Sequence, residues 1–472
     1  MVSHPYIPNA EPHIKRAMLE SIDAASIAEL YADIPDELRL QEPLALPQPL
    51  PAESDLQQLL SRLLHKNRTT ATHLSFLGGG CYDHYVPAVC DEINARGEFL
   101  TAYAGKTYTD HGKWQALFEF TSMMGELLEM DVVNIPTYDG YQAAATALRM
   151  AGRITQRPLV LAPDSIAPGM RAKFQDYCPP DVQLRWIPYD RATGCWDASA
   201  LAQQLNQDVA AIFIENPSHL GVLEENVAAI IEMAHAHGAL AVVYVNPITL
   251  GVLAPPASFG ADIVCGDIQP LGIAMQYGGG HGGFIATHDD PRFVMEYPSR
   301  LYGIAPTSQP GEFGFGEVAF ERTSFAHREN AREFTGTAAN LWAITAGVYL
   351  ALMGPQGMQE LGETLVARAA YAMRRLNELP GVKAPHFRAA HFHEFVVNFT
   401  DTHLTVAEIN RQLREQGIFG GYDLSKAFPR LGQAALYCIT EQHTKADIDH
   451  LVHALGHILA PSFSSPSSEK TL

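Results

Sequence analysis

The chain of 472 residues lacks an excess of basic side chains. It carries 32 lysines and arginines against 52 aspartates and glutamates, which gives a formal net charge of −20. Nucleic acids and anionic membrane surfaces are bound through basic patches, so this charge balance argues against nucleic-acid and membrane partners. Other proteins and small molecules remain as the expected partners.

Long uninterrupted apolar segments are also missing. The first twenty residues contain no apolar core of the length that a signal peptide requires, and the apolar stretch 238–257 is broken by Asn246 and three prolines. The hydrophobic content of 47% is nevertheless enough to build a large core. We therefore expect a globular protein of the cytoplasm.

Cysteine and histidine spacing gives no sign of a disulfide framework or a metal centre. The six cysteines contain no CxxC pair, as is usual for reduced thiols in a reducing compartment. Of the two HxH pairs, His235 with His237 lies at an expected helix end. Only His391 with His393, in an expected strand, would point both rings to one face. No third ligand is near in sequence, so we expect no bound metal.

No lysine occurs between Lys173 and Lys383. This interval contains residues 238–283, around which we expect the chain to be organised. Its two short β-branched runs, 240–245 and 261–265, are typical of strands buried on both faces of a parallel sheet. They open onto loops rich in proline and glycine, where open α/β sheets bind ligands. A Schiff base needs an amine that can lose its proton, and arginine cannot supply one, so the interval excludes such a linkage.

Strands and helices alternate along the chain before this stretch. Apolar runs at 158–162, 183–188 and 209–215 are separated by helical segments, which predicts a parallel sheet with crossover helices. The aromatic and glycine-rich region 291–335 is expected to be mostly loop. A smaller unit follows, with one expected strand at 394–399 and another near the C-terminus.

These patterns divide the chain into four expected parts. Residues 1–70 form a helical arm with too few apolar residues for a domain, and residues 71–350 form a large α/β domain. Residues 351–460 form a small C-terminal α/β domain. The tail, 461–472, is polar and interrupted by prolines, so we expect it to be disordered.

Three consecutive glycines, Gly78 to Gly80, precede a group of polar and aromatic residues. Glycine lets the backbone approach a neighbour closely, but a run of three has neither Walker nor Rossmann spacing, so it is weak evidence for a phosphate loop. A tight structural turn explains it equally well. Residues 131–153 read as a strand, a turn and an alanine-rich helix, which favours either an anion at the helix N-terminus or close packing on the sheet.

Several motifs together carry a resemblance to a known family. They are YIPN at 6–9, ADIPDELRL at 32–40, SFLGGGCYDHYVPAV at 75–89, NPITLGVLAPP at 246–256, GADIVCGDIQPLGI at 260–273 and GIFGGYDLSKAFPRLG at 417–432. With them the sequence resembles, over almost its whole length, the α subunit (subunit 1) of the two-subunit glycine dehydrogenase (decarboxylating), the P-protein of the bacterial glycine cleavage system.

The resemblance implies a fold, a cofactor and partners. The fold would be α/β and aspartate-aminotransferase-like, which is fold type I of the pyridoxal-phosphate-dependent transferases. Pyridoxal phosphate would be bound by a homologous β subunit and not covalently by this chain, within an α2β2 assembly. The implied oxidoreductase reaction decarboxylates the amino acid glycine and passes its aminomethyl group to the lipoyl group of the H-protein. We expect no activity from this chain alone.

A second absence agrees with the missing lysine. Cofactor-binding members of this fold carry an aspartate near the end of the strand before the lysine, which keeps the pyridine nitrogen protonated. Here that strand reads AVVYVNP and offers no carboxylate. The lysine itself would be expected near residues 267–270, which read DIQP. Two cofactor-binding groups are therefore missing from one chain.

We expect this subunit to complete a pocket in the assembly rather than to supply catalytic or cofactor-binding groups. The candidates to line that pocket are Tyr82, Asp83, His84, Tyr103 and Lys106. The last two belong to an aromatic and polar loop. Lys106 is a candidate because its ammonium group could pair with a carboxylate.

Two segments depart from the family. After Tyr103 the chain reads AGKTYTDHGKW, where the family usually has a proline-containing TPYQPEISQG, and ERTSFAHRENAREFTG replaces REQHIRREKATSN. These departures leave open a paralogue that acts on a different amino acid or carrier. A non-catalytic scaffold or regulatory subunit is also left open. The lysine gap disfavours a stand-alone lyase or aminotransferase.

Overall fold

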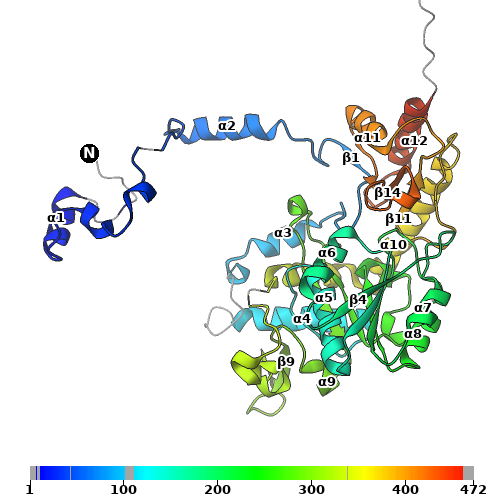
Figure 1. The fold of residues 1–472 in the computed structure, drawn as a ribbon, viewed down its shortest axis with the longest axis horizontal. Coiled ribbons are helices and arrows are strands. Elements are labelled where there is room, and N and C mark those ends of the chain that lie inside the picture. Colours follow the sequence, from blue (N-terminus) through cyan, green and yellow to red (C-terminus); the bar gives the residue numbers. More distant parts are fainter. Residues whose placement is uncertain (1–6, 8–10, 43, 101–110, 337, 461–472) are drawn as a thin grey trace, which may run out of the picture. The chain divides into compact units, whose positions relative to one another are not determined.

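The computed structural model describes residue 7 and residues 11–42, 44–100, 111–336 and 338–460 (Figure 1). It separates the chain into two compact units, residues 1–68 and 69–472. Each unit is described by itself. Tyr103, Lys106, the other residues of 101–110 and the tail 461–472 lie outside the described residues.

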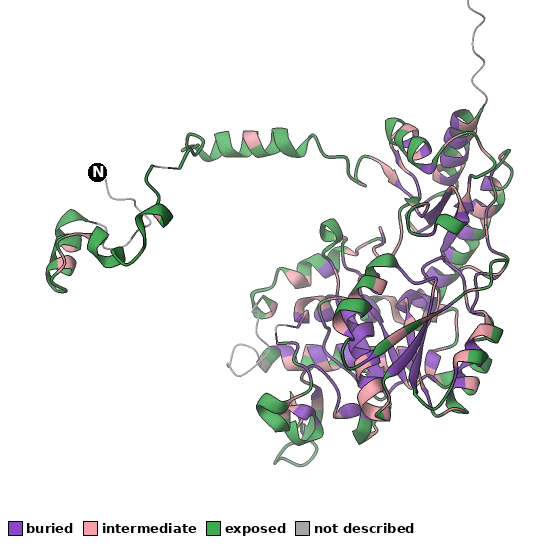
Figure 2. Ribbon diagram, viewed as in Figure 1, coloured by how far each residue is buried: buried purple, intermediate pink, exposed green. Residues whose placement is uncertain are grey.

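The first unit is a string of short helices without an interior. It contains α1 (Pro12–Glu20), η1 (Ile27–Tyr31), η2 (Asp36–Leu38) and α2 (Glu53–Leu64). Helix α2 is favoured by acidic residues in its first turn and an arginine in its last, which complement the helix dipole. No described residue of this unit is buried (Figure 2). The described residues of this unit thus form no hydrophobic core of their own.

The second unit is built around a seven-stranded sheet with the order β2-β8-β7-β6-β5-β3-β4. Strands β3 to β7 are parallel, and β8 pairs antiparallel with both β7 and β2. The strands are β2 (Val132–Val133), β3 (Leu159–Pro163), β4 (Gln183–Ile187), β5 (Val209–Glu215), β6 (Leu240–Val245), β7 (Ile263–Asp267) and β8 (Gly283–Thr287). The parallel α/β sheet predicted from the alternating pattern is confirmed, with the expected β6 and β7 at its centre.

Both faces of this sheet are buried, which explains the continuous apolar runs of its strands. Val243 and Val264 belong to one core cluster, whereas Val242 and Cys265 belong to another, because successive side chains of a strand point to opposite faces. Helices α5 and α6 lie on one side of the sheet and α7 and α8 on the other (Figure 1). Their bounds are Gly140–Thr155, Pro168–Tyr177, Ala198–Gln204 and Val227–His235.

Further helices complete the layer around the sheet. They are α3 (Ala88–Asn94), α4 (His111–Leu128), α9 (Pro291–Val294) and the long α10 (Asn340–Leu376). Helix α10 is kinked at Gly354, whose φ of 58° is left-handed, and Pro355 follows directly. The kink falls close to the predicted boundary between residues 350 and 351, and the division into a large and a small domain remains a prediction.

The C-terminal part carries its own three-stranded antiparallel sheet, with the order β11-β14-β13. Its elements are β11 (Glu394–Asn398), α11 (Val406–Glu415), β12 (Ile418–Phe419), β13 (Tyr422–Asp423), β14 (Ala434–Cys438) and α12 (Lys445–Leu459). Capping boxes begin both helices, at Thr405 and Thr444. Strand β12 pairs in parallel with β1 (Leu74–Ser75), so the segment that leads to Gly78 is anchored on this part.

Two expectations about irregular segments need correction. Residues 291–335 contain a hairpin of β9 (Tyr302–Pro306) and β10 (Phe313–Glu317), where aromatic and apolar residues alternate with small ones. His391 and His393 precede the strand that was expected to contain them, because β11 begins at Glu394. Among the described residues, no helix has both the length and the apolar character needed to cross a membrane.

Alanine substitutions at two glycines test how closely the C-terminal part packs against the rest of the second unit. Gly221 has a φ of 79°, and a Cβ there would lie 2.2 Å from the carbonyl oxygen of Glu394. Gly278 has a similar φ of 89° with nothing within 4 Å. We expect Gly278→Ala to lower the free energy of unfolding by about 1 kcal/mol through backbone strain alone. Gly221→Ala should lose at least about 2 kcal/mol more, because the clash adds to the strain. Urea unfolding measures both, and equal losses would contradict the close contact.

Candidate functional site

A small cavity lies at the carboxyl ends of the three central strands, where ligands bind in open α/β sheets. Glu215 and Asp267 end β5 and β7, and Asn246 follows β6. The cavity volume is about 40 Å³. Such a space holds about three water molecules. It is lined by Gly79, Gly80, Tyr82, Tyr141, Glu215, Pro217, Ser218, His219, Tyr244, Val245, Asn246, Asp267, Pro270, His393 and Glu394.

The glycine run closes one side of this cavity by approaching Glu394. A Cβ on Gly78 would lie 2.2 Å from Oε1 of Glu394, so only glycine fits there. The amide of Gly79 donates a hydrogen bond to the same oxygen at 2.7 Å. The hydroxyl of Tyr82 donates to the other carboxyl oxygen at 2.9 Å. The tight approach that the three glycines predict is therefore an approach to a carboxyl group.

Gln269 holds the same segment from the side of the sheet. Its amide oxygen accepts from the backbone N–H of Tyr82 at 3.0 Å, and its amide nitrogen donates to the Tyr82 carbonyl at 2.9 Å. The nitrogen also donates to the carbonyl of Ile273 at 2.9 Å. The side chain is 1% exposed and fully used as a tether. Gln269 is thus a tether within residues 267–270, where a cofactor-binding member of this fold would carry its lysine.

Two buried carboxyl groups of the cavity hold their protons. Burial raises the pKa of Glu215 to about 8, although a hydrogen bond from the His219 amide opposes the shift and the nearby Glu394 adds to it. Burial likewise raises the pKa of Glu394 to about 7, against the bonds from Gly79 and Tyr82. Both groups are therefore largely neutral near pH 6.

Asp267 is satisfied differently, by donors on two sides. Its carboxylate accepts from the backbone N–H of Gly140 at 2.7 Å and from that of Gln269 at 2.9 Å. The ring of His281 lies 3.1 Å from the same carboxylate, and this bond is the main reason that the pKa of His281 rises to about 10. Gly140 opens α5, so Asp267 occupies the helix N-terminus at which the sequence allowed an anion to bind.

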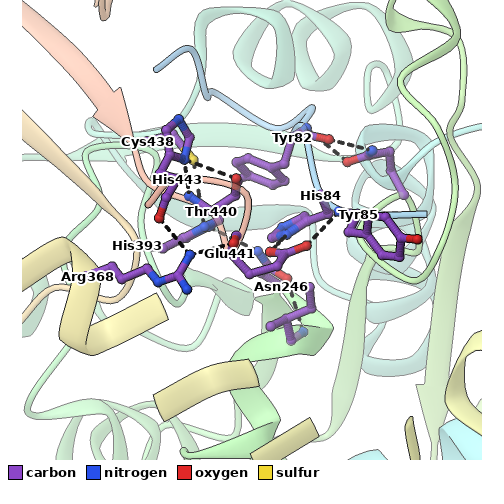
Figure 3. Close-up of polar contacts among 12 residues, drawn as sticks. Tyr82, His84, Tyr85, Asn246, Arg368, His393, Cys438, Thr440, Glu441 and His443 are labelled. Carbon is purple, nitrogen blue, oxygen red and sulfur yellow. Dashed lines mark hydrogen bonds and ion pairs between the residues drawn. The ribbon is translucent and has the colours of Figure 1, made fainter. Parts of the chain in front are cut away.

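A second polar cluster lies beside the cavity (Figure 3). His84 donates from Nδ1 to Glu441 at 2.7 Å, and the backbone N–H of Tyr85 donates to the other oxygen at 2.6 Å. Burial alone would raise the pKa of Glu441, but these bonds outweigh it and the pKa is lowered. Arg368 donates to the backbone carbonyls of Glu441 and His443 at 2.5 and 2.6 Å.

The histidines at the cavity are neutral because they are buried. Burial lowers the pKa of His219 to about 4 and that of His393 to about 3. Nε2 of His219 has no hydrogen-bond partner among the described residues, so it is free to bind a water molecule. Among the described residues no group of three metal-ligating side chains could hold a metal ion.

Of the predicted pocket residues that the structure describes, one lines the cavity and two do not. Tyr82 lines the cavity, whereas His84 faces Glu441 and Asp83 is half-buried, with a pKa that burial raises. Tyr103 and Lys106 lie outside the described residues. Their roles as pocket-lining residues therefore remain predictions.

Sequence reasoning missed four acidic residues of this region: Glu215, Asp267, Glu394 and Glu441. A signal existed for the first two, because each is a carboxylate at the end of an apolar strand, VAAIFIE or IVCGD. No local pattern marks Glu394 or Glu441, whose contacts are with residues more than 300 positions away.

The lining decides what the cavity can bind. Among the described residues, three carboxyl groups and two neutral histidines line it, and no lysine or arginine does. Such a surface can hold water and protons. It repels a phosphate group, which needs cations or free amides.

Comparisons with known proteins agree on one family. The family model of the glycine cleavage system P-protein matches residues 4–455. The chain is 36% identical to the probable glycine dehydrogenase (decarboxylating) subunit 1 of Staphylothermus marinus, over 97% of this chain and 99% of that protein. It is 38% identical to the protein of that name from Geobacillus kaustophilus, over 96% of this chain and 99% of the relative.

Solved structures extend the likeness to the fold. A crystal structure of glycine decarboxylase (P-protein) of the glycine cleavage system, in an inhibitor-bound form, superposes with a TM-score of 0.83 at 34% identity, covering 97% of this chain and 100% of that one. A sphingosine-1-phosphate lyase of Burkholderia pseudomallei superposes with a TM-score of 0.65 at 17% identity, covering 89% and 92% of the two chains. The predicted aspartate-aminotransferase-like fold, fold type I, is thereby confirmed.

The raised pKa of Glu215 predicts a stability that falls with rising pH. Above its unfolded pKa of about 4.5 this carboxyl ionises in the unfolded chain but keeps its proton in the folded one until about pH 8. The folded state is then penalised by up to about 1.4 kcal/mol per pH unit. Glu215→Gln removes this penalty, so its stability relative to wild type should rise between pH 5 and pH 8.

Urea unfolding at a series of pH values measures this difference. The matched control is Glu415→Gln, which removes an exposed carboxylate paired with Arg411. Its stability relative to wild type should change little over the same range. A flat difference for Glu215→Gln would show that Glu215 is ionised in the folded chain.

Proposed function

The chain belongs to the glycine cleavage system P-protein family, and we propose that within the family's two-subunit enzyme it is the subunit that does not carry the cofactor. The resemblance to glycine dehydrogenase (decarboxylating) subunit 1 is confirmed, and the chain is a component of a glycine-decarboxylating oxidoreductase. The division of labour between the subunits is the part that we propose.

The cavity at the central strand ends supports this division. Pockets for molecules of cofactor size are roughly 300 Å³ or larger, whereas this cavity measures about 40 Å³. Its described lining carries carboxyl groups and no lysine or arginine, which does not fit a phosphorylated cofactor. Gln269, which cannot form a Schiff base, is tied to Tyr82. The site of this chain therefore does not fit pyridoxal phosphate, and this observation carries the proposal.

The lysine and the cofactor then belong to a second subunit. The relatives are named subunit 1, which implies a second subunit in their enzyme. We propose that pyridoxal phosphate is bound there, in an α2β2 assembly in the cytoplasm, and that the aminomethyl group of glycine passes to the lipoyl arm of an H-protein. Tyr82, Asp83, His84, Tyr103 and Lys106 are our proposed contributions of this chain to the shared pocket.

The exposed apolar side chains of the first unit support the proposal that a partner binds tightly. Sixteen large apolar side chains of residues 7–64 are exposed, from Ile7 at 58% to Leu64 at 58%. An uncovered apolar surface of this extent is typical of a protein–protein contact. Permanent interfaces resemble a domain core cut in half, and we propose that the second subunit supplies the other half.

Separating the subunits tests where the cofactor resides. We expect neither this chain nor the second subunit alone to exchange labelled bicarbonate into glycine, whereas the mixture should do so. After treatment with borohydride, the reduced cofactor should be found by mass spectrometry only on the second subunit. A stable reduced adduct on any lysine of this chain would overturn the proposal. Activity of this chain by itself would do so as well.

The apolar face of α2 tests the proposed interface. Leu56, Leu60 and Leu63 lie on one face of the helix, between 45% and 49% exposed. Changing all three to glutamine should weaken association with the second subunit at least tenfold, because the apolar surface that would be buried is lost. Sedimentation of the mixed subunits measures it.

A matched variant changes the opposite face of the same helix. Gln58→Ala with Arg62→Ala should leave the association unchanged. If the leucine variant assembles as tightly as wild type, α2 lies outside the interface.

A further inference from the structure

A second and much larger cleft lies at the same edge of the main sheet. It has a volume of about 640 Å³, which is within the usual range for small-molecule sites. One wall follows the carboxyl ends of β3 and β4, with Asp164 and residues 188–191. The other wall is the loop 427–430 of the C-terminal part. The ends of parallel strands and the junction of two layers are both common positions for ligands.

Two arginines without partners among the described residues line this cleft, one on each wall. Arg191 and Arg430 are exposed, and neither has an ion pair or hydrogen bond to a described residue. Both guanidinium groups act on the hydroxyl of Tyr189, where they oppose the pKa rise that burial causes. The two charges therefore belong to one cleft, one on each of its walls.

The carboxylates of the lining are already used. Asp164 pairs with Arg171, which also stacks on Trp186 with its guanidinium carbon 4.0 Å from the ring centre. Asp190 accepts from the backbone amides of residues 192 and 193 at 3.0 and 2.8 Å. Asp197 caps α7 through two backbone amides. None of them pairs with Arg191 or Arg430, so these two cations remain available to a ligand.

Apolar surfaces lie between the polar groups. Tyr189 and Phe428 line the cleft together with prolines of both walls. The ring of Tyr189 packs edge-on against Phe387, with centroids 6.0 Å apart. This contact helps to hold the Tyr189 ring in position. A ligand for this cleft needs an apolar body as well as an anionic group.

We propose that this cleft binds a small organic anion, a phosphate monoester or a carboxylate with an aromatic or apolar body. Arg191 and Arg430 hold the anionic group by charge-assisted hydrogen bonds, and the rings of Tyr189 and Phe428 contact the body. In a chain of net charge −20, two unpaired arginines in one cleft are a local exception. The site differs from the 40 Å³ cavity, among whose described lining residues there is no lysine or arginine. Its occupant spans both walls and so fixes the loop 427–430 against the sheet.

Calorimetric titration of the assembled two-subunit enzyme tests the proposal. The probes are inorganic phosphate, phenyl phosphate, phthalate and uncharged phenol. Phenyl phosphate or phthalate should bind more tightly than inorganic phosphate, and phenol should not bind. The comparison of phenyl phosphate with phthalate identifies the preferred anion. The affinity should fall as the salt concentration rises, because the cations are partly exposed.

Three variants locate the binding. Arg191→Gln and Arg430→Gln should each weaken it at least tenfold, since each removes a charge-assisted bond. Arg411→Gln removes the same charge from the C-terminal part outside the cleft, and it should bind like wild type. Equal affinity in all three variants would overturn the site. Absence of binding by every anion, or binding by the isolated chain but not by the assembled enzyme, would also overturn it.

Discussion

The hydrogen bonds of Glu394 fix the geometry of the central site. This buried carboxyl accepts from Gly79 and Tyr82, and Gly78 lies so close to it that no side chain fits between them. Glu394 begins β11 in the C-terminal part, whereas the glycine run lies more than 300 residues earlier. One group therefore joins the small sheet, the glycine run and the end of the large sheet. Its neutral form near pH 6 lowers the desolvation cost of burying it beside Glu215.

The same contacts explain why the central site is closed. Tyr82 lines the cavity and is held there by hydrogen bonds to both Glu394 and Gln269. Asp267 takes the amide of Gly140 at the start of α5, so this helix N-terminus is not offered to a phosphate. The absence of lysine between Lys173 and Lys383 is thus accompanied by carboxyl groups in the described lining of the site. The fold itself does not need the cofactor, because both faces of the sheet are packed with apolar side chains.

The sequence predicts the large elements well and the site only in part. Strand β5 lies at the residues expected from its apolar run, because a strand buried on both faces leaves a simple local pattern. The hairpin of β9 and β10 was missed, since glycines interrupt its pattern and its pairing is set by contacts between strands. Tyr82 could be singled out from the residues after the glycine run. Glu394 and Glu441 could not, because tertiary contacts alone bring them to that run.

The small central cavity and the larger cleft lie at the carboxyl ends of different strands of the same sheet. The carboxyl ends of β5 to β7 meet Tyr82 and Glu394, whereas those of β3 and β4 meet only the loop 427–430 across an open cleft. The first contact buries Glu215 and Glu394, and this burial raises the pKa of both carboxyl groups. The second leaves Arg191 and Arg430 in water, where their charge costs little. In this acidic chain the central cavity is therefore lined by carboxyl groups, whereas two arginines without partners among the described residues line the cleft at the neighbouring strand ends.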